Sequence, residues 1–305
     1  MFFDTHCHLN FKAFDEGVKE VINRANKVGN DQIIIPGTDI ETSKKAIKIA
    51  EKYKGVYAAV GIHPHHVYEF LKAQISVFST ASPQRGPRRL SQKQKSAHFL
   101  SQELKKIENL LSNKKVVAIG EVGIDRHIYQ KTVYKIYKVE EEFIKLQKEF
   151  LKEQIKLAIK YDKSLILHNR EAREDILGVL REMWDKKLEG RAVFHCCEPD
   201  VVGTIHELSL LEFAKSHKMF IGVDGDIVYH REKQEFIKTV PLEMLVLETD
   251  SPFLSPMRQY PNEPKNIILI AELIAKLKNI PIKKISEITT ENARRLFKVS
   301  PSSKV

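Results

Sequence analysis

The segment Ser164-Leu-Ile-Leu-His-Asn-Arg170 contains three consecutive apolar residues followed directly by a histidine. The segments Gln32–Pro36 and Leu245–Leu247 have similar continuous apolar runs. Such runs are typical of parallel β-strands, because helices cover both faces of a parallel sheet. The three segments therefore predict an α/β protein with a parallel sheet.

Short apolar or β-branched runs recur eight times along the chain and alternate with longer amphipathic stretches. We expect strands at Phe2–His8, Gln32–Gly37, Val56–Ile62, Val116–Val122, Ser164–His168, Ala192–Cys196, Met219–Val223 and Met244–Glu248. We expect helices at Thr42–Tyr53, Glu140–Tyr161, Glu171–Lys186, Val201–His217, Lys265–Lys278 and Ile282–Phe297. An eightfold strand–helix alternation within about 250 residues favours a (β/α)8 TIM barrel over a doubly wound open sheet. The barrel is expected to be a single domain over residues 1–299, followed by a C-terminal tail at residues 300–305.

One segment interrupts this alternation after the third predicted strand. Residues 72–101 contain the stretch Ser82-Pro-Gln-Arg-Gly-Pro-Arg-Arg89, and they include six basic residues and no acidic residue. Because this composition is too polar to pack against a core, it predicts a surface insertion. A second interpretation, in which the basic residues contact nucleic acid, stays open.

The composition excludes general disorder, since 42% of the 305 residues are hydrophobic and can bury a sizeable core. The formal net charge of +10 suits a polyanionic substrate, although solubility alone can explain such a value. The cysteines Cys7, Cys196 and Cys197 do not suggest a disulfide framework. No segment is long and apolar enough to span a membrane. We expect a soluble cytoplasmic protein with no membrane association, and the sequence implies no protein partner.

Histidines and carboxylates collect at the ends of the predicted strands, where a barrel places its active site. His6 and His8 lie at the end of the first strand. Side chains two apart in a strand point to the same side, so both imidazoles can face the barrel interior and chelate one ion, while Cys7 points into the helix layer. A His-x-His pair alone is weak evidence for a metal site.

Four further ionisable residues occupy equivalent positions. Glu121 lies near the end of the fourth strand, His168 and His195 end the fifth and sixth strands, and Asp250 follows the eighth. An ionisable group directly after an apolar run is costly to bury unless it is paired or bound to a metal. Flanking glycines at 120 and 123 are expected to leave room for a close approach to Glu121, whose two oxygens can bridge two cations.

These nitrogen and oxygen ligands, without thiolates, suit two divalent ions such as Mg²⁺, Mn²⁺ or Zn²⁺. Two metals about 3.5–4 Å apart can clamp the attacking and leaving oxygens of an in-line phosphoryl displacement. The chain has no Gly-x-x-x-x-Gly-Lys loop and no Gly-x-Ser-x-Gly motif, so covalent mechanisms have little support. The pattern therefore favours metal-dependent hydrolysis.

Six motifs in order resemble the signature of the TatD metal-dependent deoxyribonucleases, within the amidohydrolase-like superfamily. They are Asp4-Thr-His-Cys-His-Leu9, Gly61-Ile-His-Pro-His65, Gly120-Glu-Val-Gly-Ile-Asp125, His168-Asn-Arg-Glu-Ala172, Phe194-His-Cys196 and Glu248-Thr-Asp-Ser-Pro-Phe-Leu254. The resemblance extends from Phe2 to about Phe297 and is interrupted only by the basic insertion. It implies a (β/α)8 barrel that cleaves DNA with two metal ions as an exonuclease, with RNA as an alternative substrate.

The resemblance also implies roles for individual residues. The metal ligands would be His6, His8, Glu121, His168, His195 and Asp250, with Glu121 as the bridge and with Glu121, Asp250 and His63 as the catalytic residues. Asp250 would act as general base, and His63 would contact the scissile phosphate or the leaving group. His65 and Arg170 would bind substrate, since the Arg fork matches phosphate oxygens. Glu248 would orient a ligand rather than bind the metal.

Some positions depart from the family pattern and leave the substrate open. Cys197-Glu-Pro-Asp200 stands where the family usually has Phe-Ser-Gly or Phe-Thr-Gly, and the Arg258-x-x-x-Asn262-x-Pro264 pattern lacks its usual glycine. Two alternatives therefore remain: an amidohydrolase-like enzyme for a small amide, lactone or phosphoester, and a non-catalytic nucleic-acid-binding barrel. Many such enzymes bridge their metals with a carboxylated lysine on the fourth strand, so Glu121 favours the deoxyribonuclease.

Overall fold

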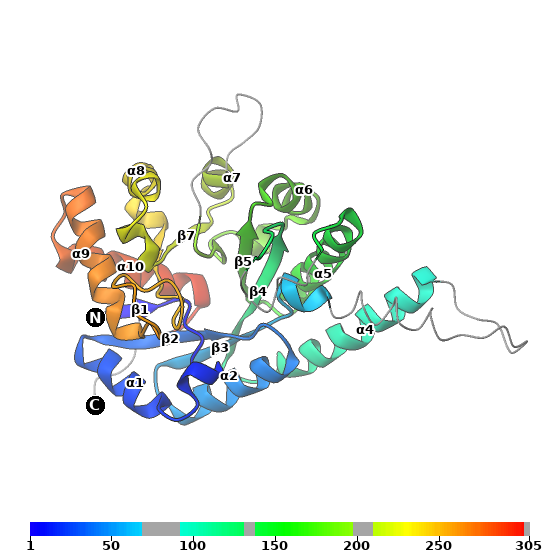
Figure 1. The fold of residues 1–305 in the computed structure, drawn as a ribbon, viewed down its shortest axis with the longest axis horizontal. Helices are drawn as coiled ribbons and strands as arrows, with labels where there is room; N and C mark the ends of the chain where they lie inside the picture. Colours follow the sequence, from blue (N-terminus) through cyan, green and yellow to red (C-terminus); the bar gives the residue numbers. More distant parts are fainter. Residues whose placement is uncertain (69–91, 131–137, 198–209, 302–305) are drawn as a thin grey trace, which may run out of the picture.

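Eight parallel strands pair in chain order and close into a barrel in the computed structural model, which describes residues 1–68, 92–130, 138–197 and 210–301 (Figure 1). The strands are β1 (Phe2–Asp4), β2 (Asn30–Pro36), β3 (Val56–Val60), β4 (Val116–Asp125), β5 (Ser164–Arg170), β6 (Ala192–Phe194), β7 (Phe220–Val223) and β8 (Leu245–Leu247). Each corresponds to one apolar segment, so the predicted (β/α)8 TIM barrel is confirmed.

Helices surround the barrel and cover the outer faces of its strands (Figure 1). They are α1 (Val18–Lys27), α2 (Ile40–Lys52), α4 (Gln92–Leu110), α5 (Glu141–Lys160), α6 (Arg173–Met183), α7 (Leu210–Ser216), α8 (Arg231–Thr239), α9 (Ile267–Lys278) and α10 (Ile282–Phe297). Their apolar faces pack on the outward-facing strand residues and form the larger of two core clusters.

The second core cluster fills the barrel interior. Each strand contributes one buried residue, and the eight are Phe3, Ile34, Ala59, Ala118, Ile166, Val193, Phe220 and Val246. The helix α10 packs against this layer with Ala293, Leu296 and Phe297, so it covers the amino-terminal end of the barrel. The opposite, carboxyl end is where the predicted ligands follow the strands.

The barrel closes where β1 meets β8. Asp4 lies opposite Leu247, and the two chains remain paired after both strands end, through a bridge between Cys7 and Ser251. Backbone hydrogen bonds from Asp250 N to His6 O (2.9 Å) and from His8 N to Ser251 O (2.7 Å) extend this pairing. The first and last strands thus carry their functional residues in a fixed register.

Several predicted boundaries were wrong. β1 and β6 end at Asp4 and Phe194, before the histidines that follow them, while β4 and β5 continue to Asp125 and Arg170. Strand ends depend on pairing with neighbours, which an apolar run does not reveal.

The predicted insertion at residues 72–101 needs a correction at its carboxyl end. Residues 69–91 lie outside the described part of the chain, but residues 92–101 belong to α4 and are not loop. Their sequence includes two Gln and two Lys residues and no Gly or Pro, a composition that permits a helix even where apolar residues are few. The first part of the predicted helix Val201–His217 also lies outside the described residues, and α7 accounts for the remainder.

Candidate metal centre

His6, His8 and Asp250 come together at the carboxyl end of the barrel, held by the paired chain extensions of β1 and β8. The Nε2 atoms of His6 and His8 lie 3.1 Å apart. Asp250 Oδ1 is 3.8 Å from His6 Nε2 and 3.4 Å from His8 Nε2. Asp250 adopts a left-handed backbone conformation (φ 48°), which Asp tolerates better than most residues. These ligand atoms form one potential metal-binding group.

Glu121 lies in the middle of β4, where the pairing with β5 is irregular between Ile119 and Val122. Such irregularities change the direction of a side chain and are common beside active sites. Gly123 was expected to leave room beside Glu121, but the structure gives it a different role. A Cβ at this position would lie 1.8 Å from the carbonyl oxygen of His168. This glycine therefore lets β4 and β5 approach each other.

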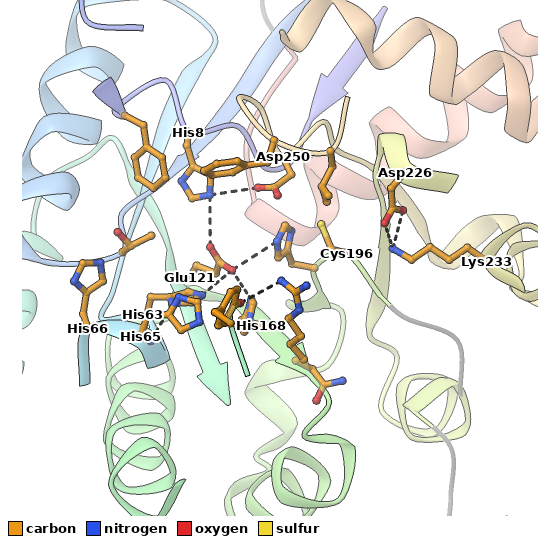
Figure 2. A pocket seen from close by; sticks show the side chains of 18 residues that line it. His8, His63, His65, His66, Glu121, His168, Cys196, Asp226, Lys233 and Asp250 are labelled. Atoms are coloured by element: carbon orange, nitrogen blue, oxygen red, sulfur yellow. Dashed lines mark hydrogen bonds and ion pairs between the residues drawn. The ribbon is translucent and has the colours of Figure 1, made fainter. Parts of the chain in front are cut away.

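The two carboxylate oxygens of Glu121 face two different groups of imidazoles (Figure 2). Oε2 lies 3.3 Å from His6 Nε2 and 3.6 Å from His8 Nε2. Oε1 lies 2.7 Å from His168 Nδ1 and 3.6 Å from His195 Nε2. The structure thus brings all six predicted ligands together in one cluster, with Glu121 within 3.6 Å of each of the four histidines.

The pKa values of the histidines in this pocket indicate a site that favours positive charge. Burial lowers the pKa of His6, which keeps its imidazole in the neutral form that binds metals. Burial also opposes charge on His168 and His195, but nearby carboxylates outweigh it and raise their pKa values to about 9 and about 10. Without a cation, these two imidazoles would therefore hold protons to balance Glu121 and its neighbours. Divalent ions can supply that charge instead, so the donor set fits a metal centre.

Glu248 lies directly behind His195, one of the predicted ligands. Its Oε1 is 3.2 Å from His195 Nδ1 and accepts a hydrogen bond from Cys196 N (2.5 Å), while its Oε2 accepts from Thr5 Oγ1 (3.4 Å). Its carboxylate thus faces the ring nitrogen of His195 that points away from Glu121. This is the orienting position that the sequence suggested, because a carboxylate there fixes the ring of a ligating histidine.

His63 joins the second group, with its Nε2 3.3 Å from Glu121 Oε1. Its Nδ1 accepts a hydrogen bond from the backbone N–H of His65 (3.2 Å). Burial lowers the pKa of His63 to about 3, so the ring is neutral near pH 7 and carries its proton on Nε2. His63 is therefore a hydrogen-bond donor toward the pocket.

Asp125, which lies in one of the motifs but received no role from the sequence, organises the neighbouring side chains. Its Oδ2 is 2.6 Å from His65 Nε2, 3.2 Å from His168 Nε2 and 2.8 Å from Tyr129 Oη. Because the Nε2–H of His168 faces this carboxylate, Nδ1 is the nitrogen that would bind a cation once this imidazole has lost its second proton. The sequence did contain a signal for this role, because Asp125 is an acidic residue at the end of an apolar strand, four positions after Glu121.

Replacing Asp125 with Asn should weaken metal binding or activity by about 10- to 100-fold, since the amide no longer favours the required tautomer of His168. Titration of the metal and steady-state kinetics would measure both effects. Asp162→Asn is a matched control, because Asp162 precedes β5 at the opposite end of the barrel. Unchanged metal affinity and unchanged kinetics in Asp125→Asn would contradict an orienting role.

Five of the six predicted ligands, all except the buried His6, line a cavity of about 380 Å³. Of the residues predicted to bind substrate, His63, His65 and Arg170 all line it. The Nε2 of His65 faces Asp125, and Arg170 donates to Tyr129 Oη (3.2 Å) and lies over the Tyr129 ring. Their contact with substrate stays a prediction.

Another part of the cavity was not anticipated from the sequence. Lys233 and Asp226 line it with an ion pair of 2.7 Å, on the far side of Cys196 from Glu121 (Figure 2). Asp226 lies three residues after β7, the same spacing as that of Asp250 after β8, so its position was an available signal, whereas Lys233 lies in α8 with no motif to mark it. No helix among the described residues is long and apolar enough to cross a membrane.

Comparison with known proteins identifies related sequences over the whole chain. A family profile described as "TatD related DNase" matches residues 3–298. The metal-dependent hydrolase YabD of Bacillus subtilis is 32% identical over 304 residues, covering 98% of this chain and 100% of YabD. The mouse protein named "Putative deoxyribonuclease TATDN3" is 30% identical over 297 residues, covering 96% and 87% of the two chains. The crystal structure of YjjV, a TatD homologue from Escherichia coli K12, superposes with a TM-score of 0.74 at 26% identity, covering 98% of both chains.

Proposed function

Because the chain belongs to the TatD-related DNase family, and so is a metal-dependent hydrolase, we propose that it cleaves phosphodiester bonds of DNA as an exonuclease with two divalent metal ions. The observation that carries this proposal is the position of Glu121, whose two oxygens face separate groups of histidines. The name of the mouse relative supports a DNA substrate. RNA is the alternative polymer.

The residues divide into two ligand groups in this proposal. His6, His8 and Asp250 would hold one ion and His168 and His195 would hold the other, with Glu121 facing both groups of histidines. Two such ions, when bound, polarise the phosphate and lower the pKa of water. Mg²⁺, Mn²⁺ and Zn²⁺ all accept nitrogen and oxygen ligands of this kind.

Asp250 and His63 have complementary proton-transfer properties. Burial opposes ionisation of Asp250, but the neighbouring histidines outweigh it and hold its pKa below the ordinary value. Its carboxylate is therefore ionised at neutral pH and can take a proton from the attacking water. His63 presents Nε2–H to the pocket and can donate to an oxygen of the scissile phosphate. Arg170, at the wall of the same cavity, is placed for a second phosphate contact.

The proposal is tested with end-labelled single-stranded and duplex DNA and RNA, each incubated with Mg²⁺, Mn²⁺, Zn²⁺ or EDTA. We expect stepwise release of mononucleotides from DNA with a divalent ion and none with EDTA. An Asp250→Asn protein purified in the same way controls for contaminating nucleases. Hydrolysis of a lactone, amide or small phosphoester, without any release of nucleotides, would replace the DNA proposal with the amidohydrolase alternative.

A further inference from the structure

Part of the cavity wall is aromatic and apolar, although most of the residues that line the cavity are polar. The loops that follow β1 and β8 contribute Phe11, Phe253 and Leu254 to this wall. These residues are not ligands and have no part in the proton transfers described above. Their function must therefore come from what they contact inside the cavity.

The two phenylalanines extend an aromatic cluster that begins at a proposed metal ligand. The Phe11 ring lies nearly parallel to the His8 ring, with centroids 4.2 Å apart and an interplanar angle of 17°. Phe253 lies edge-on to Phe11, at 6.1 Å and 71°, and edge-on to His8, at 6.4 Å and 67°. An aromatic surface thus begins at the metal site and continues along one side of the cavity.

Phe253 is 44% exposed, and it is the one exposed phenylalanine among the side chains that the structure describes. Its backbone is fixed: Phe253 N donates to Asp250 O (2.8 Å), and its carbonyl accepts from Asn262 Nδ2 (2.8 Å). Asn262 is fully buried and also donates from Nδ2 to Thr249 O (2.9 Å) and from its backbone N to Pro252 O (2.9 Å). The loop therefore holds the ring at the cavity, three residues from Asp250.

We propose that Phe253, supported by Phe11, is a stacking subsite for an unpaired nucleobase next to the scissile phosphate. This inference rests on the proposed function, because it takes the phosphate to lie at the histidine cluster. Aromatic side chains bind bases of any sequence, since every base has a π-face. The subsite favours a single-stranded or frayed end, because a base stacked on Phe253 cannot remain paired in a duplex.

Binding tests the subsite independently of catalysis. Two oligonucleotides carry the fluorescent base 2-aminopurine at the 5′ or the 3′ end, next to a hydrolysis-resistant linkage. We expect wild-type protein to quench one of the two labels, because stacking quenches this base. Phe253→Ala and Phe253→Leu should lose the quenching, while Phe253→Tyr should keep it.

Kinetics provide the second measurement. Phe253→Ala should raise KM for a single-stranded substrate by roughly 5- to 100-fold. An abasic terminal nucleotide should have a similar effect on the wild type, and the two changes should not add, because both remove the same contact. Tyr260→Ala is the matched control, since Tyr260 is an aromatic residue of the same loop, is 71% exposed and does not line the cavity.

The outcomes separate the two proposals. Absence of quenching with both labels, or equal quenching by wild type and Phe253→Ala, would overturn the subsite whether or not DNA is cleaved. Quenching that depends on Phe253, in a protein that cleaves no DNA, would retain the subsite and reject the nuclease. A change of oligomeric state in Phe253→Ala with unchanged quenching would identify the ring as part of a protein interface instead.

Discussion

Glu121→Gln is expected to lower kcat/KM by on the order of 10² or more. Gln has nearly the same shape, but it removes the charge that faces both groups of histidines, and its NH₂ cannot accept from them. Two cations in one pocket would then repel each other without a bridging charge. Metal stoichiometry should fall below that of the wild type, as measured by elemental analysis of the dialysed protein.

Glu243→Gln is the matched control for this substitution, because Glu243 is exposed and precedes β8 at the opposite end of the barrel. Both variants should fold, since the interior layer of the barrel does not include either residue. Circular dichroism would verify this. If Glu121→Gln kept more than about a tenth of the wild-type activity, the activation free energy would have risen by less than about 1.4 kcal/mol. That result would exclude Glu121 as the bridge between two metal ions.

Removal of metal is expected to abolish hydrolysis and to lower the thermal stability. An ion at one hundred times its Kd stabilises the folded state by about 2.7 kcal/mol, which corresponds to a change in Tm of about 5 °C in a chain of this size. Calorimetry before and after EDTA, and after addition of Mn²⁺, would measure the change. A Tm that does not respond to either addition would contradict a metal centre in this pocket.

The size of this Tm change should depend on pH, because protons compete with the ion. Without metal, nearby carboxylates raise the pKa values of His168 and His195 to about 9 and about 10, so binding must displace their protons. The stabilisation by Mn²⁺ should therefore be smaller at pH 6 than at pH 8. His8→Ala should remove the response, while His230→Ala, at an exposed histidine outside the cavity, should keep it.

The barrel could be predicted because its strands are buried on both faces and read as apolar runs. The convergence of the six residues predicted as ligands could also be predicted, since His168 and His195 directly follow such runs and Asp250 lies three residues after one. The ends of β1 and β4 could not be predicted, because backbone pairing with neighbouring strands decides where a strand stops. The position of Glu121 in the middle of a strand depends on an irregular pairing that leaves no compositional trace.

The sequence revealed less about contacts between side chains from distant segments. Asp125 contacts His168, and Glu248 contacts His195. The tautomer of His63 that donates from Nε2 is set by the backbone N–H of His65, which donates to Nδ1. The aromatic wall joins Phe11 and Phe253 across the seam of the barrel. Neither phenylalanine differs in local sequence from a core residue, so only the fold identifies them as part of the cavity.

The pairing of β1 with β8 has a consequence for the synthesis of the protein on the ribosome. Thr5 Oγ1 donates to Leu247 O, a contact between residues 242 positions apart, and α10 covers the barrel only after both strands have been made. A nascent chain therefore exposes the unpaired edge of its first strand and the apolar barrel interior until β8 and α10 have left the ribosome. Such intermediates aggregate readily, so chaperones and the rate at which the β8–α10 segment is translated should influence the yield of active protein.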